Sequence, residues 1–318
     1  MNNSHKPDSF SHWSDYWAGG ALTSLPQDFA GNYDGEVADF WHARLAEISH
    51  PGRVLDLCTG NGPIALLAAS WAHQHAVALD IVAVDAAQPR PEQVPGLSED
   101  QRKLLETVEF HAGTPIEALP FADGSFDLIT SQYGLEYCDL DRAAGQVSRL
   151  LRPGGVLAIV AHAADSAMIE TMQDELAGYQ LLDKLRLVRL LRSWGRGQLA
   201  DPDFVRRTTS ALTQLQRDHS RQAGSPLVAQ AGQAVYGLLQ MSAEQRRSQR
   251  PAAAAYADQL HAGQARLADM LRVNQKISEN PNWHQPLKDA GLVLRASQVL
   301  IYRGEHAMGQ AMEWFKPA

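Results

Sequence analysis

Cysteine and long apolar runs are both scarce in this chain of 318 residues. It holds two cysteines, too few for the disulfide framework of a small secreted fold, and this fits a reducing compartment. Hydrophobic residues make up 45% of the chain, yet no run of about 18 apolar residues occurs, so we expect no transmembrane helix. The first residues, MNNSHK, lack the apolar core of a signal peptide. These absences predict a cytoplasmic protein.

Positive charge is scarce as well. The chain has 28 Lys and Arg against 36 Asp and Glu, a formal net charge of −8. Nonspecific nucleic-acid binding depends on phosphate neutralisation, so nucleic acid is a poor candidate partner. Residues 163–280 differ, with 15 basic against 12 acidic residues, and only there would an anionic partner be favoured. No spacing of His, Cys, Asp and Glu suggests a metal site, so none is expected.

The most informative stretch is VLDLCTGNGPI at residues 54–64. Apolar residues around Asp56 predict a buried strand, and Pro63 suits the first turn of a helix. Between them, Gly60 and Gly62 lack a Cβ, so the chain can turn sharply and a ligand can approach the backbone. Such a strand, turn and helix form the core of a nucleotide-binding βαβ unit. An acid aimed into that crevice would repel a pyrophosphate, but it suits a ligand that carries an ammonium and a sulfonium group.

Further strand signals follow in order along the chain. Residues 81–85, IVAVD, predict a second buried strand that ends in an acid, and an acid there can accept hydrogen bonds from both ribose hydroxyls. Residues 108–111 predict a short third strand. Residues 123–131 predict a turn and a fourth strand, and residues 149–160 a helix end, a turn and a fifth strand.

The blocks VLDLCTGNG, IVAVD, LPFADGSFD and LRPGG together resemble the motifs of the class I S-adenosylmethionine-dependent methyltransferases. The resemblance covers residues 53–161 and implies an α/β fold with a doubly wound, mostly parallel seven-stranded sheet. It also implies S-adenosyl-L-methionine as the cofactor and S-adenosyl-L-homocysteine as the product. Cys58 departs from the family's D-x-G-x-G-x-G pattern. Many relatives also carry an aspartate for the adenine amine where this chain has Thr114 and Pro115, so the Thr114 hydroxyl or a backbone carbonyl would replace it.

The resemblance places the cofactor across the carboxyl ends of the first two strands. Asp56 and Gly60 would approach its methionine part, Asp85 its ribose, and residues 114–116 its adenine. Tyr33 resembles a tyrosine in the N-terminal helix of many small-molecule methyltransferases, which closes over the methionine part; fastening that segment to the sheet is the alternative. The cofactor-binding residues that we expect are Tyr33, Asp56, Cys58, Thr59, Gly60, Asn61, Gly62, Asp85, Ala86, Thr114, Pro115, Ile116 and Ser131.

Methyl transfer asks the protein mainly to align the reactants, exclude water and remove a proton where the acceptor is a hydroxyl. The Asp/Asn-Pro-Pro-Tyr block expected for amide or exocyclic-amine methylation is missing after the fourth strand, where residues 131–137 read SQYGLEY. Residues after that strand face the crevice, so Tyr133 and Glu136 are candidates to position the acceptor or take its proton. His162 is the other candidate base, because imidazole titrates near neutrality. A hydrogen-bonded structural role is the alternative for His162.

The sequence divides into three predicted parts. Residues 1–45 hold eight aromatic residues and predict a helical lid. Residues 46–162 and 281–318 predict the methyltransferase-like domain. Between them, residues 163–280 are rich in Leu, Ala, Gln and Arg and predict a large helical insertion, either a cap or a dimerisation surface.

One helix of the insertion carries two distinct faces. Apolar residues recur between positions 181 and 194 at helical spacing, and four arginines between positions 186 and 196 form another face of the same helix. Those arginines are either a solvated surface or a basic wall for a carboxylate or phosphate substrate.

We therefore expect methyl transfer to a small molecule, at an oxygen, nitrogen or carbon nucleophile, by in-line displacement in an enclosed pocket. The first alternative is a macromolecular methyltransferase that docks protein or RNA on the insertion. The second is a non-catalytic cofactor-binding scaffold or regulator. The expected partners are a small-molecule substrate, anionic if the basic face borders the site, and a second copy of the chain if the insertion dimerises; no membrane partner is expected.

Overall fold

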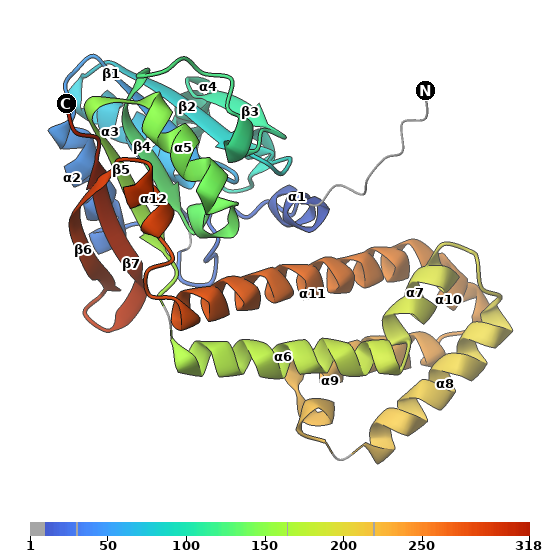
Figure 1. Ribbon diagram of the computed structural model, residues 1–318. Coiled ribbons are helices and arrows are strands. Elements are labelled where there is room, and N and C mark those ends of the chain that lie inside the picture. The colour runs from blue at the N-terminus through green and yellow to red at the C-terminus, as the bar shows by residue number, and fades with distance from the viewer. Residues whose placement is uncertain (1–9, 30, 164, 219) are drawn as a thin grey trace, which may run out of the picture. The chain divides into compact units, whose positions relative to one another are not determined.

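The computed structural model describes residues 10–29, 31–163, 165–218 and 220–318 (Figure 1). The chain divides into two compact units. We call the first, residues 1–164 with 273–318, the sheet unit, and the second, residues 165–272, the helical unit. The division expected from the sequence, at residues 45, 162 and 280, stays a prediction, and so does the role of the insertion.

Within the described residues, seven strands form one sheet in the order β3-β2-β1-β4-β5-β7-β6. Strands β1 to β5 pair in parallel, and β7 is antiparallel to both of its neighbours. The doubly wound, mostly parallel sheet expected from the sequence is confirmed. The strands are β1 Gly52–Leu57, β2 Leu79–Asp85, β3 Glu109–Ala112, β4 Phe126–Gln132, β5 Leu151–Ala161, β6 Val293–Tyr302 and β7 His306–Phe315.

The last two strands pair antiparallel because a tight turn joins them. Only residues 303–305 separate β6 from β7, and Arg303 and Gly304 both have positive φ, of 51° and 75°. Consecutive residues with positive φ match the twist of a hairpin turn. A parallel pair would need a crossover of a dozen or more residues, so this short connection excludes it.

Helices cover both faces of the sheet. The core on one face contains residues of α2 and α3, and the core on the other contains residues of α5, α12 and the end of α11. The helices of this unit are α1 Ser11–Ala18, α2 Gly35–Glu47, α3 Pro63–His75, α4 Glu99–Glu106, α5 Leu140–Leu150, α12 Gln285–Asp289 and, from Val273 onward, α11 Arg250–Glu279.

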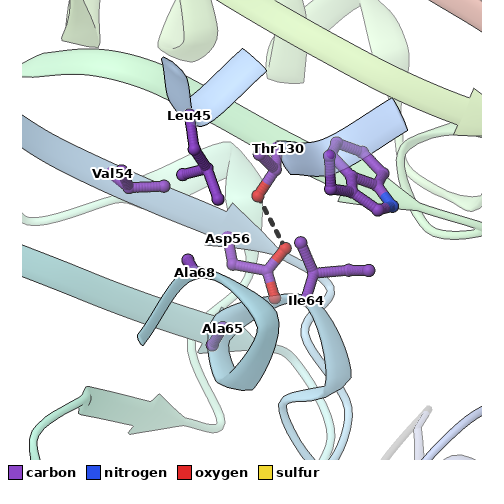
Figure 2. A pocket seen from close by; sticks show the side chains of 8 residues that line it. Leu45, Val54, Asp56, Ile64, Ala65, Ala68 and Thr130 are labelled. Atoms are coloured by element: carbon purple, nitrogen blue, oxygen red, sulfur yellow. Dashed lines mark hydrogen bonds between the residues drawn. The ribbon is translucent and has the colours of Figure 1, made fainter. Parts of the chain in front are cut away.

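Alternate residues of β1 serve the two faces, because side chains of a strand point to opposite sides in turn. Leu55 and Leu57 belong to the core that contains α5. Val54 belongs to the core of α2 and α3, and Asp56 lines a small cavity together with it. Figure 2 shows the Asp56 carboxylate beside Thr130 and the first turn of α3.

Tyr33 does not lie in a helix, which differs from what the resemblance implies. α2 begins only at Gly35, after Asp34 in an extended conformation (φ −131°, ψ −174°). Gly35 has a φ of 50°, so the chain changes direction just before the helix. Tyr33 is nevertheless buried, in the core formed with α2 and α3.

The helical unit is built from helices around one apolar core. None of the described helices, in either unit, has the length and apolarity needed to cross a bilayer. The helices of the helical unit are α6 Ser166–Lys184, α7 Leu187–Gly195, α8 Asp201–Arg217, α9 Pro226–Gln240, α10 Ala243–Ser248 and the larger part of α11.

The single helix expected across residues 181–194 is broken in the structure. α6 ends at Lys184 and α7 starts at Leu187, with Arg186 in the left-handed region (φ 59°) between them. The break lets apolar residues from both helices reach the same core. The four arginines therefore do not share one helix, and Arg192 and Arg196 both pair with Asp258 (2.7 and 3.0 Å).

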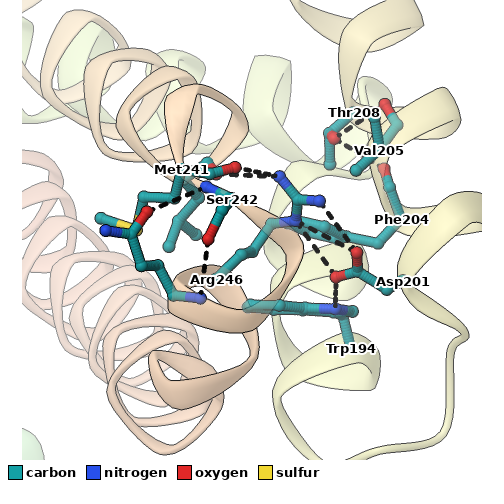
Figure 3. A network of polar contacts seen from close by, with 10 residues as sticks. Trp194, Asp201, Phe204, Val205, Thr208, Met241, Ser242 and Arg246 are labelled. Atoms are coloured by element: carbon teal, nitrogen blue, oxygen red, sulfur yellow. Dashed lines mark hydrogen bonds and ion pairs between the residues drawn. The ribbon is translucent and has the colours of Figure 1, made fainter.

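A buried ion pair connects α8 to α10 (Figure 3). Arg246 is 7% exposed, and its Nη2 lies 2.9 Å from Oδ2 of Asp201. The same guanidinium donates to the carbonyl of Met241 (2.9 Å), just after α9, and Trp194 donates to Asp201 (3.1 Å). The Arg246 guanidinium holds the pKa of the Asp201 carboxyl below its ordinary value. One arginine thus ties together three neighbouring helices.

We predict that Asp201→Ala destabilises the helical unit by about 2–3 kcal/mol, because it leaves the charge of Arg246 buried without its carboxylate. Asp203→Ala on the same helix is the matched control. It removes an ion pair with Arg206 whose side chains are 70% and 46% exposed, and this should leave the stability close to that of the wild type. Urea unfolding measures both values, and equal losses in the two variants would contradict the assignment.

Candidate active site

The residues expected to act on a ligand gather at the carboxyl edge of the sheet. The strand order reverses between β1 and β4, which are neighbours in the middle of the sheet. In doubly wound sheets, ligands bind outside the carboxyl ends of the strands at this reversal point. The glycine turn after β1 and the segment after β4 both start there.

The turn after β1 depends on residues without a Cβ. Gly60 and Gly62 have positive φ, of 54° and 81°. A Cβ on Gly62 would lie 2.7 Å from the Phe110 ring, and one on Gly60 would lie 2.4 Å from the Trp17 ring. Gly62 precedes Pro63, which opens α3. Both glycines are therefore required by backbone conformation and by close packing.

Asp85, at the end of β2, connects the first two strand ends. One carboxylate oxygen accepts the N–H of Gly60 (2.8 Å), and the other accepts the N–H of Ala87 (2.7 Å). The N–H of Thr114 donates to the carbonyl of Asp85 (2.8 Å), which brings the loop after β3 to the same point. Burial raises the pKa of Asp85. The residues predicted to contact the methionine part, the ribose and the adenine thus lie side by side. Ala86 and Pro115 directly follow Asp85 and Thr114 in the chain.

Asn61 fastens the N-terminal segment to the turn. Its amide nitrogen donates to the carbonyls of Trp17 (2.9 Å) and Ala21 (2.7 Å), and its oxygen accepts the N–H of Arg90 (2.8 Å). The side chain is fully buried. Its role here is to join three backbone segments, and contact with a cofactor through its backbone stays a prediction.

α1 lies over this edge of the sheet through its aromatic side chains. The Trp17 ring packs against Gly60, and the Tyr16 ring packs against Trp17 with centroids 4.9 Å apart. One turn earlier, the Trp13 ring meets Tyr137, which follows β4, edge to face at 5.6 Å. The helix thus spans from the glycine turn to the segment after β4.

Asp56 is enclosed beneath α2 and α3, and its expected approach to the methionine part of the cofactor stays a prediction. It is 1% exposed and lines a cavity of about 10 Å³ under α2 and α3 (Figure 2). Thr59 and Thr130 donate hydroxyl hydrogen bonds to its two oxygens, at 2.6 and 2.8 Å. Burial raises the pKa of Asp56 to about 7. Through the hydrogen bond from Thr59, the Asp56 carboxylate fixes the turn after β1. It does so from the face of the sheet opposite to Leu55 and Leu57.

Cys58 takes the place of a glycine and is accommodated by a glycine elsewhere. Its φ is 54°, and a Cβ on Gly134 would lie only 2.3 Å from the Cβ of Cys58. Its sulfur lies 3.8 Å from that of Cys138. The hydrogen bond with Cys138 and burial raise the pKa of the Cys58 thiol well above its ordinary value, so the thiol stays protonated.

Three other predicted cofactor contacts have buried side chains. Tyr33 shares a hydrogen bond with the Ser24 hydroxyl (3.0 Å), and burial raises its pKa to about 12. Ile116 is 3% exposed within the apolar core. Ser131 is fully buried and accepts the N–H of Leu135 (3.1 Å). Their roles in cofactor binding stay predictions.

The three predicted catalytic residues are brought together. Nδ1 of His162 lies 2.7 Å from Oε1 of Glu136, which also accepts the backbone N–H of His162 (3.0 Å). The Tyr133 ring lies 4.9 Å from the imidazole between centroids. The Tyr133 hydroxyl donates to the carbonyl of Met308, and burial raises its pKa, so this phenol stays protonated. A proton-accepting role for Tyr133 stays a prediction, and the geometry favours positioning.

The site residues predicted from the sequence do not include Trp13, Trp17, Tyr137 or Cys138. Trp13 and Trp17 lie four residues apart and therefore on one face of α1, which is the signal that could have pointed to a shared target. No local pattern indicates that the target is Gly60 and Tyr137. No group of three or more metal-ligating side chains occurs among the described residues.

A family model described as a methyltransferase domain matches residues 48–219, which is 172 of 318 residues and more than half of the chain. The chain therefore belongs to this methyltransferase domain family, and the resemblance to class I enzymes is confirmed.

Individual relatives match only part of the chain. A demethylmenaquinone methyltransferase of Thermus thermophilus is 32% identical over 124 residues, which cover 38% of this chain and 53% of that protein. A malonyl-[acyl-carrier protein] O-methyltransferase of Methylococcus capsulatus is 36% identical over 138 residues, covering 41% and 46%. The chain thus spans about half the length of these curated relatives. Among solved structures, the [4+2]-cyclase SpnF is 15% identical, with a TM-score of 0.40 over 98% of this chain and 93% of that one.

The burial of Asp56 predicts a pH dependence of stability. The pKa of Asp56 in the folded protein, about 7, lies above the value of about 3.9 for an unfolded aspartate, so the folded state binds the proton more tightly. This contribution is fully present below about pH 4 and is lost as the pH rises through about 7, by at most about 1.4 kcal/mol per pH unit. Asp56→Asn should remove that dependence, because an amide does not ionise.

Urea unfolding at pH 5 and pH 7 checks this prediction. The wild type should lose about 2 kcal/mol more than Asp56→Asn between the two pH values. Asp80→Asn, whose carboxylate is exposed at the other end of β2, is the control and should follow the wild type. Parallel pH profiles for all three proteins would contradict the prediction.

Proposed function

We propose that this chain transfers a methyl group from S-adenosylmethionine to a small-molecule acceptor by in-line displacement. The observation that carries the proposal is the meeting of the Asp85 carboxylate and the Gly60 turn at the reversal point of a class I sheet. Membership of the methyltransferase domain family supports it. One relative is named for demethylmenaquinone and another for a malonyl group on a carrier protein, and both names describe methyl acceptors.

The donor set at this edge fits the proposed cofactor. Asp85 offers two carboxylate oxygens with lone pairs left over for ribose hydroxyls, because each oxygen accepts only one backbone N–H. Gly60 would approach the methionine part, and the loop of residues 114–116 the adenine. When bound, S-adenosylmethionine supplies a methyl group already activated by its sulfonium.

The residues around this position would align the reactants and exclude water. Trp17 now covers the face of Gly60 that the cofactor would approach, so α1 has to move aside to admit it. Once α1 returns, its aromatic faces would attract the sulfonium and seal the site. The helical unit belongs to the proposal as a cap or a dimerisation surface, with net basic charge that would suit an anionic acceptor.

We predict that Asp85→Ala weakens S-adenosylmethionine binding by more than tenfold, because it removes both the ribose acceptor and the anchor of the Gly60 turn. Titration calorimetry measures the affinity, and circular dichroism confirms that the variant is folded. Asp80 lies near the amino end of the same strand, away from the predicted site. The Asp80→Ala variant should therefore bind S-adenosylmethionine like the wild type. An unchanged affinity in Asp85→Ala would overturn the cofactor assignment.

The small-molecule acceptor is tested with methyl-labelled S-adenosylmethionine and host-cell extract, separated into metabolite, protein and RNA fractions. Enzyme-dependent label should enter the metabolite fraction and should disappear with Asp85→Ala. Label confined to protein or RNA, or label in no fraction, would overturn the proposed function.

A further inference from the structure

The pair of Glu136 and His162 has the geometry of a positioned base. Glu136 is 1% exposed, and its Oε1 lies 2.7 Å from Nδ1 of His162. The same oxygen accepts the backbone N–H of His162 at 3.0 Å. One carboxylate oxygen therefore fixes both the main chain and the ring of the histidine, directly after β5.

This arrangement decides which ring nitrogen carries the proton. A carboxylate only accepts hydrogen bonds, so Nδ1 of His162 must be the donor. In a neutral imidazole the lone pair then resides on Nε2. Nε2 has no hydrogen bond to the described residues, and 13% of the side chain remains exposed. The nitrogen that can accept a proton is therefore left open for a ligand.

The second oxygen of the carboxylate is also without a partner in the described part of the chain. Oε2 of Glu136 is buried and accepts no hydrogen bond there. A buried negative charge with an unused oxygen favours a positive charge beside it, and a protonated His162 would supply one. Glu136 is therefore placed to stabilise the imidazolium that forms when Nε2 accepts a proton.

Flat aromatic rings border the imidazole. Glu136, Tyr133 and Tyr137 are the titratable side chains packed against His162 in the described residues, with ring centroids at 4.9 Å for Tyr133 and 5.7 Å for Tyr137. The Tyr133 hydroxyl is committed to the Met308 carbonyl. Both tyrosines thus offer ring surface, and Trp13 extends that surface through its contact with Tyr137. An aromatic or otherwise flat acceptor would pack well on these faces.

We infer that His162 is the general base of the reaction and that the acceptor is methylated at a hydroxyl carried by a flat, unsaturated group. The inference rests on the proposed methyl transfer. In the step, the acceptor O–H bond breaks and its proton passes to Nε2 of His162, while the oxygen forms a bond to the methyl carbon. The carbon–sulfur bond breaks, and its electron pair stays on sulfur, which becomes a neutral thioether. Glu136 acts as a positioning residue, through His162.

An amine acceptor would make less use of this pair. A neutral amine already carries the lone pair that attacks the methyl group, so it can react before it loses a proton. A hydroxyl is a weak nucleophile until its proton leaves, and a base aligned with it contributes on the order of 10²–10⁴-fold to the rate. A buried carboxylate and histidine held by two hydrogen bonds thus favour oxygen.

The first test identifies the atom that carries the label. The labelled compound from the metabolite fraction is isolated, and mass spectrometry with NMR locates the new methyl group. An O-methyl group on an aromatic or enolic carbon supports the inference. An N-methyl or C-methyl product, or an O-methyl group on a saturated carbon, overturns it while leaving the proposed function intact. Absence of label from metabolites instead defeats the proposed function.

The second test separates chemistry from structure with variants of the pair. His162→Asn should lower kcat with the isolated acceptor by at least about 100-fold, with KM and S-adenosylmethionine affinity by calorimetry within threefold of the wild type. Glu136→Gln should lower kcat by about tenfold, because the amide can still accept from Nδ1 but carries no charge to stabilise the imidazolium.

The pH profile completes this test. The wild-type kcat should fall on the acid side as His162 becomes protonated, and this acid limb should be absent in His162→Asn. His111→Asn is the matched control, because His111 forms a pair of the same length with Glu109 (2.7 Å) on β3, with side chains 29% and 55% exposed. It should leave kcat and the profile unchanged. A kcat for His162→Asn within threefold of the wild type, or an acid limb that persists, overturns the inference.

Discussion

The edge of the sheet is organised by one carboxylate that accepts two backbone N–H groups. Asp85 ties the turn after β1 to the turn after β2, because its donors are Gly60 and Ala87. Both donors belong to the main chain, so the arrangement does not depend on flexible side chains. Each carboxylate oxygen keeps acceptor capacity after its backbone bond. Ribose hydroxyls could therefore be bound without first breaking the contacts that shape the site.

Local features of the sequence were sufficient to predict the sheet and the order of the motifs along it. Hydrophobic strands that end in Asp56 and Asp85, and glycines at the turn, are signals that residues a few positions apart carry by themselves. The predictions of a helix around Tyr33 and of one helix across residues 181–194 were wrong because tertiary packing overrides the local pattern there. Gly35 and Arg186 adopt positive φ where the chain must redirect side chains into a shared core, and packing decides this.

The sequence named the residues that the structure brings together after β4 and β5, but it did not predict their contacts. Glu136 and His162 were both expected near the acceptor, yet their pairing depends on the register of β4 against β5, in which Gln132 lies opposite Val160. That register brings the ends of the two strands level, and the short turn at residues 135–137 then returns Glu136 to His162. Asp56 lies on the face of β1 opposite to Leu55 and Leu57, as strand alternation requires.

α1 contacts both the turn after β1 and the segment after β4. Trp17 rests on the glycine turn and Trp13 on Tyr137, and the two indoles project from adjacent turns of one eight-residue helix. The helix therefore covers Gly60 and Tyr137 at the same time. The hydrogen bonds of Asn61 to the carbonyls of Trp17 and Ala21 fasten the carboxyl end of α1 to the turn. With α1 in this position, water is excluded from both regions together.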